Sequence, residues 1–137
     1  MTTYNTEQIL YFQARAESLK MSYPREFSEF APETLAKICN GIGGEGSKLS
    51  PILSWIYAKF QTSGSIHDVR YGVGGNEDDR LIADHEFLEN MLLEWADDWG
   101  WFRWFRPLAR AERRQIQAAY LAVRSFGKSF FNKKAEK

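Results

Sequence analysis

The chain has 137 residues, of which 44% are hydrophobic and 15% aromatic, a composition typical of a globular protein and not of a disordered one. This length fits one domain with its own core, and the single cysteine, Cys39, excludes an intrachain disulfide and fits a reducing compartment. The zero net charge hides an asymmetry, because residues 1–102 contain 8 Lys and Arg against 16 Asp and Glu, and residues 103–137 contain 10 against 2. The basic region therefore either binds a phosphate-rich surface or pairs with the acidic region inside the fold.

The N-terminal half predicts two helices separated by prolines. Apolar residues at helical spacing predict a helix over 6–20, with Asn5 or Thr6 as its N-cap. Pro24 and Pro32 interrupt the pattern, and residues 31–39 predict a short helix. Residues 40–47, "NGIGGEGS", predict a loop with unusual backbone freedom because four of them are glycines. Residues 51–60, "PILSWIYAKF", form a helix, a strand or an irregular segment, of which we favour a helix or an irregular segment.

The C-terminal half predicts three further helices. One carries residues 67–71 and ends at "GVGG", and Asn76 then caps a helix whose first turn is acidic. We expect one face of that helix to contain Leu81, Asp84, Leu88, Met91 and Trp95. A last helix over 109–127 ends at Gly127, and we expect Ile116, Tyr120, Val123 and Phe126 to point inward. The predicted fold class is mostly α.

The most informative residues are His67 and Asp68, which follow the glycine-rich segment in sequence. Neighbours on a helix point about 100° apart, so Asp68 can face the glycine segment while His67 and Tyr71 face the following helix. Asp84 on that helix is then the natural partner of both. A histidine that is held by a carboxylate can act as a general base on water, and glycine carbonyls with one carboxylate suit a hard cation such as calcium.

These residues in this order resemble the phospholipase A₂ family, which carries a calcium loop C-G-x-G-G-x-G, then H-D-x-x-Y, then an aspartate on an antiparallel helix. Here the loop reads "CNGIGGEG" and is followed by "HDVRY" and "AD". The resemblance implies a small helical domain in which two antiparallel core helices carry the HD and AD motifs. It implies His67 as general base, supported by Asp84 and Tyr71.

The same resemblance implies a calcium ion as cofactor. Its ligands would be the carboxylate of Asp68 and the backbone carbonyls of Cys39, Gly41 and Gly43. The segment between the loop and His67 is longer than in the secreted enzymes and lacks their cysteines, so the layout is more similar to the lipase domain of parvovirus capsid proteins. It is also similar to small uncharacterised proteins of bacteriophages and prophages.

The expected organisation is a single domain over residues 1–137. It would comprise an N-terminal helix (6–20), a calcium-loop and catalytic core (33–96) and an aromatic, basic helical region (97–131). The N-terminus has no signal-like apolar run, and no window approaches the roughly 20 apolar residues of a membrane span. We therefore expect a protein of the cytoplasm of the producing cell or one associated with a phage.

Each key residue also has a purely structural interpretation. His67 could be a buried histidine that only bonds Asp84, and Asp68 could be a helix cap or a solvated acid. A zinc site is disfavoured because Asp84 and His85 are neighbours and cannot both point inward, so His85 is expected in solvent. Cys39 is expected to be a small core residue.

The segment "WADDWGWFRWFRP" holds four of the five tryptophans. Tryptophan and arginine together are typical of a membrane interface, so Trp99, Trp101, Trp104, Arg103 and Arg106 predict contact with a phospholipid surface. The same residues could instead form core or oligomer contacts. The sequence contains no motif for specific nucleic-acid recognition.

The sequence thus predicts calcium-dependent hydrolysis of the sn-2 ester of glycerophospholipids. Two alternatives remain from other classes: a non-enzymatic structural or host-interaction protein of a phage on the same helical frame, and a module that only binds membrane surfaces.

Overall fold

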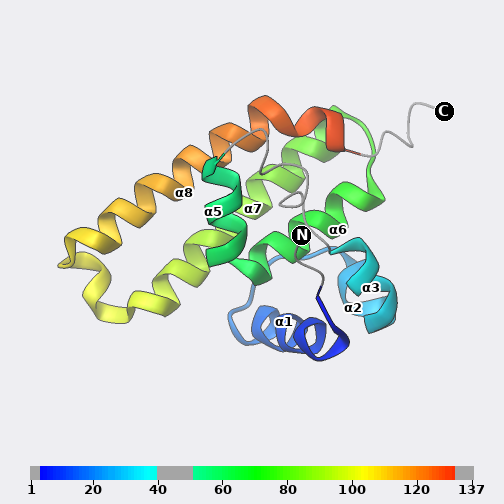
Figure 1. Ribbon diagram of the computed structural model, residues 1–137, viewed down its shortest axis with the longest axis horizontal. Coiled ribbons are helices and arrows are strands. Elements are labelled where there is room, and N and C mark those ends of the chain that lie inside the picture. The colour runs from blue at the N-terminus through cyan, green and yellow to red at the C-terminus, as the bar shows by residue number, and fades with distance from the viewer. Residues whose placement is uncertain (1–3, 40–50, 132–137) are drawn as a thin grey trace.

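The computed structural model describes residues 4–39 and 51–131, and all the regular elements in these ranges are helices (Figure 1). The prediction of a mostly α protein is confirmed. The elements are α1 (Thr6–Ser18), α2 (Arg25–Glu29), α3 (Pro32–Ile38), α5 (Pro51–Lys59), α6 (Gln61–Val73), α7 (Glu77–Trp99), the 3₁₀ turn η1 (Gly100–Trp104), α8 (Pro107–Phe126) and the 3₁₀ turn η2 (Gly127–Phe130).

Two asparagines start the helices that the sequence predicted most clearly. Asn5 and Asn76 each form a capping box, in which the side chain of the residue three positions later bonds back to the cap backbone. The residue before Asn76 is Gly75, with φ of +143°. A Cβ there would lie 2.1 Å from a carboxylate oxygen of Asp79, so glycine leaves room for the capping box and α7 can turn back sharply after α6.

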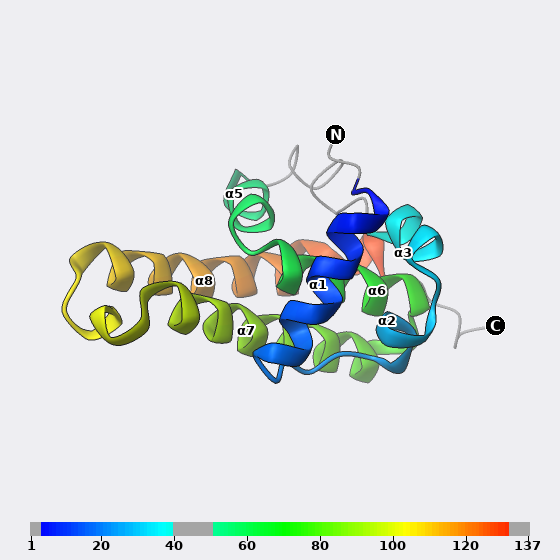
Figure 2. The same ribbon diagram turned by 90° about the horizontal axis from the view of Figure 1, so that it is seen from below.

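Helices α6, α7 and α8 form the frame on which the other helices pack. Helix α7 runs back along α6, and after η1 the chain returns along α7 as α8, so α7 and α8 form a long antiparallel pair with η1 at its outer end (Figures 1 and 2). In Figure 2, α1 crosses over α6 and α7, and α5 lies against α8.

The buried side chains form two clusters that share α6. One cluster is made mainly by α5, α7 and α8, and the other by α1, α2, α3 and the α6 residues Ile66 and Val69. Helix α6 is buried over most of its length, from Thr62 to Val69. Because α6 touches both clusters, its side chains can join the N-terminal helices to the long helix pair.

The prediction that Phe126 of α8 points inward is wrong, because its side chain is 51% exposed. On α7, the predicted face is buried at Met91 and Trp95, whereas Leu81 is 42% exposed. Residues 51–60, left undecided by the sequence, contain the helix α5. In the described part of the chain, no helix combines the length and the apolar character that a membrane crossing requires.

Candidate functional site

The centre of the candidate site is a buried bond between α6 and α7. Nε2 of His67 lies 2.9 Å from Oδ1 of Asp84, and both side chains are fully shielded from solvent. The structure therefore brings together the two residues that the sequence proposed as general base and supporting acid.

Tyr71 joins this pair as the sequence predicted. One helical turn after His67, its hydroxyl donates a hydrogen bond of 2.6 Å to the same oxygen, Oδ1 of Asp84. The imidazole is enclosed by two rings, since Phe87 stacks on it at 4.3 Å between centroids and Tyr71 lies at 4.2 Å. These contacts fix the plane of the imidazole.

The other oxygen of Asp84 binds two arginines that the sequence interpretation missed. Arg124 of α8 donates to Oδ2 at 2.6 Å, and Arg80, one turn before Asp84 on α7, lies 3.4 Å from it. The spacing of Arg80 and Asp84 is a recognisable ion-pair signal on a helix. Arg124 is 40 positions away and had no local signal.

These donors determine the charge of Asp84. Burial alone would raise the pKa of its carboxyl, but the bonds from His67, Tyr71 and Arg124 outweigh burial and lower the pKa from 3.8. An ionised carboxylate only accepts hydrogen bonds, so Nε2 of His67 carries a proton and donates it. In neutral His67, Nδ1 is then left as the acceptor.

Tyr57 of α5 lies against Nδ1 of His67. The sequence interpretation did not include this residue. Its hydroxyl lies 2.7 Å from Nδ1 of His67 and is also within hydrogen-bond reach of Asp68, so its single proton is donated to one of these two groups at a time. Burial, followed by the charge of Asp68, raises the pKa of Tyr57 well above 10.0. The ring fits against α6 because residue 64 is glycine, where a Cβ would lie 2.6 Å from it.

Asp68 follows His67 on α6, and its side chain is within hydrogen-bond reach of Tyr57 of α5. It is 6% exposed, and its charge contributes, after burial, to raising the pKa of the Cys39 thiol and of Tyr4, the latter to about 12. Cys39, whose thiol donates to the Ser65 carbonyl at 3.4 Å, is a buried core residue as expected. Asp68 is therefore close to the residue at which the glycine-rich segment begins.

Of the predicted calcium ligands, Gly41 and Gly43 lie outside the described residues, as does the rest of the glycine-rich segment. Within the described ranges, no group of three His, Cys, Asp or Glu side chains is arranged to hold a metal. His85 is exposed and lies against Tyr120, in agreement with its expected position in solvent.

The predicted membrane-contact residues lie at the turn between α7 and α8. Trp101 and Trp104 are 70% and 54% exposed, and Arg106 is exposed while Arg103 is partly buried. Trp99 differs from the other tryptophans, because it is partly buried and its indole donates to Glu112 at 2.9 Å.

Comparison of the chain with protein-family models, with curated proteins and with solved structures gave no match. A histidine whose Nε2 is held by an ionised carboxylate, with a hydroxyl oxygen on Nδ1 that also reaches a second acid, is a proton-transfer arrangement.

Proposed function

We propose that the protein is a calcium-dependent, phospholipase A₂-like enzyme that hydrolyses the sn-2 ester of glycerophospholipids. The observation that carries the proposal is the shared oxygen of Asp84, which binds both Nε2 of His67 and the hydroxyl of Tyr71. The H-D-x-x-Y and AD motifs predict these three residues, and His67 and Tyr71 both bond one atom of Asp84.

In the proposed reaction, Nδ1 of His67 takes a proton from water while the water oxygen attacks the ester carbonyl carbon. The protonated ring then gives this proton to the leaving alkoxide as the ester bond breaks, so that a fatty acid and a lysophospholipid are released. Asp84 stays ionised throughout and stabilises the imidazolium. Arg80, Arg124 and Tyr71 hold the carboxylate in position.

We propose that the attacking water takes the position of the Tyr57 hydroxyl. This hydroxyl lies within hydrogen-bond distance of the proposed base, His67, and it is also within hydrogen-bond reach of Asp68, the proposed calcium ligand. A water that is activated by the base beside the cation needs the same two neighbours. Because the Tyr57 hydroxyl occupies Nδ1 of His67, turnover requires the Tyr57 side chain to move aside.

The carboxylate of Asp68 has the chemistry of a calcium ligand. Asp68 offers a nearly buried carboxylate close to Cys39, and oxygen ligands of this kind suit a hard cation. With the carbonyls of Cys39, Gly41 and Gly43, Asp68 would hold an ion that polarises the ester carbonyl and offsets the phosphate charge.

The test is the release of fatty acid from mixed phospholipid vesicles with calcium and with a chelator. We expect calcium-dependent release, and a loss of about a thousandfold in His67→Asn, since general-base catalysis contributes on the order of 10²–10⁴. His85→Asn is the matched control, because it removes the other histidine of the chain from an exposed position. Equal rates for both variants would contradict the proposal.

One observation favours a second candidate, a non-catalytic helical module. Both nitrogens of His67 are bonded to side chains and the ring is fully shielded from solvent, as expected of a polar network that only holds helices together. This candidate predicts no hydrolysis with any lipid and a large loss of stability in His67→Asn.

A further inference from the structure

The turn between α7 and α8 exposes a continuous apolar surface. Its residues, here called the aromatic tip, are Trp101, Phe102, Trp104, Phe105 and Leu108, which are between 54% and 70% exposed. Trp101 joins the patch together, since its ring lies 4.7 Å from Phe105 and 6.2 Å from Phe102. Five large apolar side chains exposed between residues 101 and 108 differ from the single apolar residues scattered on most surfaces.

Cations accompany these rings. Residues 100–110 contain three arginines and no acid. Arg103 lies over the ring of Trp104 at 4.8 Å and Arg106 over that of Phe102 at 5.5 Å. The nearby acids Asp97 and Asp98 are paired with Arg15 at 3.2 and 3.3 Å, so the net charge of the tip surface is positive.

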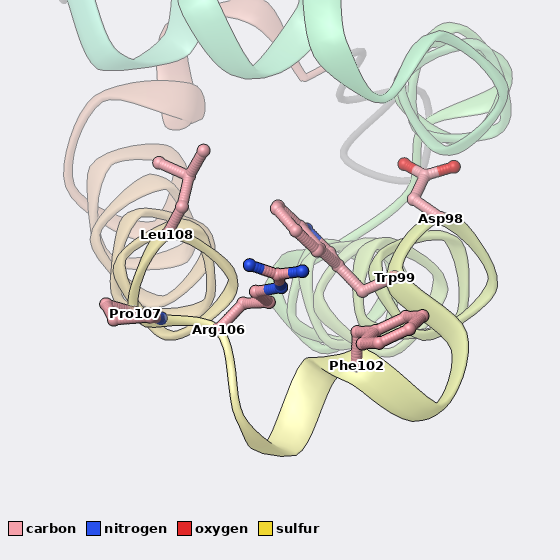
Figure 3. A pocket seen from close by; sticks show the side chains of 6 residues that line it. All are labelled: Asp98, Trp99, Phe102, Arg106, Pro107 and Leu108. Atoms are coloured by element: carbon pink, nitrogen blue, oxygen red, sulfur yellow. The ribbon is translucent and has the colours of Figure 1, made fainter.

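A hollow beside the tip is lined by apolar side chains and by an arginine. It has a volume of about 490 Å³ and is lined by Asp98, Trp99, Phe102, Arg106, Pro107 and Leu108. Figure 3 shows the guanidinium of Arg106 between the side chains of Leu108 and Trp99. A cation between apolar walls can contact a phosphate oxygen while the rings around it contact hydrocarbon.

The position of the tip leaves it accessible. Figures 1 and 2 both place η1 at one end of the long α7–α8 pair, beyond the other described helices. The aromatic tip can therefore enter a headgroup layer to the depth of an indole ring before the other described helices reach the membrane surface.

We infer that the aromatic tip binds the surface of an anionic phospholipid bilayer, with its rings at headgroup depth and Arg103 and Arg106 on lipid phosphates. Charge favours this occupant over a second copy of the chain. A twofold contact through the tip would bring the arginines of both copies together, and like charges across an interface are unfavourable.

This binding is separate from the proposed hydrolysis. Asp84 lies 15 residues before Trp99 on α7, which corresponds to about 22 Å along the helix. The tip therefore attaches the protein to the bilayer at a distance from His67. Binding should persist in a chelator and in His67→Asn, so its failure and the failure of hydrolysis can be told apart.

The experiment is co-sedimentation of the full chain, in a chelator, with vesicles of phosphatidylcholine alone or with 30% phosphatidylglycerol. We expect binding to the anionic vesicles that weakens with salt, because surface charge interactions are screened. Trp101→Ser/Phe105→Ser should weaken binding at least about tenfold, a factor worth about 1.4 kcal/mol. Leu10→Ser/Leu121→Ser is the control, since it removes two similarly exposed side chains away from the tip.

The cationic part is tested by Arg106→Gln. We expect about fivefold weaker binding, as for one basic residue near an anionic surface, whereas Arg25→Gln on α2, whose side chain is 80% exposed, should change little. Sedimentation velocity without lipid completes the test. Absence of vesicle binding, equal binding by the tip variant and its control, or dimerisation that the tip variant abolishes would each overturn the inference.

Discussion

Asp84 is the residue on which the candidate site converges. Its two oxygens contact side chains from α6, α7 and α8, namely His67, Tyr71, Arg80 and Arg124. The hydrogen bonds from His67, Tyr71 and Arg124 keep the carboxylate ionised although it is fully buried. The same contacts hold three helices together, so Asp84 has a structural role as well as the proposed catalytic one.

We predict that Asp84→Asn destabilises the protein by about 3 kcal/mol, because removing one partner of a buried ion pair leaves the other charges uncompensated. Urea denaturation measures the change in the free energy of unfolding. Asp97→Asn is the control, since Asp97 is 47% exposed and pairs with Arg15 at the surface, where a pair contributes about 1 kcal/mol or less. Equal losses in the two variants would show that Asp84 does not hold the helices together.

Tyr57 provides a second prediction at the level of single residues. Tyr57→Phe removes the hydroxyl that occupies Nδ1 of His67, so we expect the rate of ester hydrolysis to rise about fivefold, which corresponds to one ordinary hydrogen bond. The initial rate on vesicles measures this effect. Tyr11→Phe, with a 59% exposed side chain, should leave the rate unchanged.

Gly64→Ala tests the same blocking contact without altering Tyr57. The new Cβ would lie 2.6 Å from the Tyr57 ring and so push it away from His67, again raising the rate. Gly72→Ala places a methyl group on the same helix at a milder 3.2 Å from Ile38. A fall in rate in both Tyr57→Phe and Gly64→Ala would mean that Tyr57 positions His67 and does not block it.

At the level of elements, the sequence located helices better than their buried faces. Asn5 and Asn76 marked helix starts correctly because capping depends on local bonds. The buried surface of α7 is wider than the face that the sequence pattern indicated, because it also includes Glu86, Asn90 and Glu94. Each of these polar side chains has a partner on another segment; Glu86, for example, binds Arg70 at 2.8 Å. A hydrophobic pattern cannot reveal such pairs.

In the candidate site, too, the residues that follow a local sequence pattern were predicted, and a residue whose contact depends on packing was not. His67, Tyr71 and Asp84 were found because their spacing on two adjacent helices is a sequence pattern. Tyr57 was missed because it lies in an apolar segment whose helical form the sequence left open, and its contact with His67 depends on how α5 packs.

The approach of η2 to α6 gives a prediction at this scale. A Cβ at Gly127 would lie 2.5 Å from the Tyr71 hydroxyl, so Gly127→Ala should destabilise the protein by about 1–3 kcal/mol through overpacking. Thermal unfolding measures the loss. In the background of Tyr71→Phe, which has no hydroxyl at that point, the same substitution should cost less; an equal cost would contradict this explanation.

For the whole molecule, the basic region meets the acidic region at the buried bond from Arg124 to Asp84. The charge asymmetry of the sequence is therefore partly used inside the fold. Beside the aromatic tip, Arg106 is exposed and is available for an anionic surface. Arg103 is partly buried and donates to the Gly100 carbonyl, while its guanidinium lies over the ring of Trp104.

Glu94 makes the stability of the molecule depend on pH. It accepts a hydrogen bond from the Ser63 backbone amide, faces Arg15 and Asp98, and burial raises its pKa from 4.5 to about 7. The folded state therefore binds this proton more tightly than the unfolded state, and stability from Glu94 is full below pH 4.5 and lost as pH rises through about 7.

We predict that the free energy of unfolding falls by about 3 kcal/mol between pH 5 and pH 8 on account of this residue. Chemical denaturation at several pH values measures how the free energy of unfolding changes with pH, and Glu94→Gln should remove this change. Asp84 does not contribute to this window, because its pKa is below 3.8. An unaltered pH dependence in Glu94→Gln would assign this dependence to other groups.

The decisive experiment is the initial rate of fatty-acid release from phosphatidylglycerol-containing vesicles by the wild type, His67→Asn and His85→Asn, with calcium and with a chelator. We expect calcium-dependent release by the wild type and His85→Asn, and about a thousandfold less by a folded His67→Asn. Release that is independent of calcium or survives in His67→Asn would exclude the proposed hydrolysis, as would no release by the wild type.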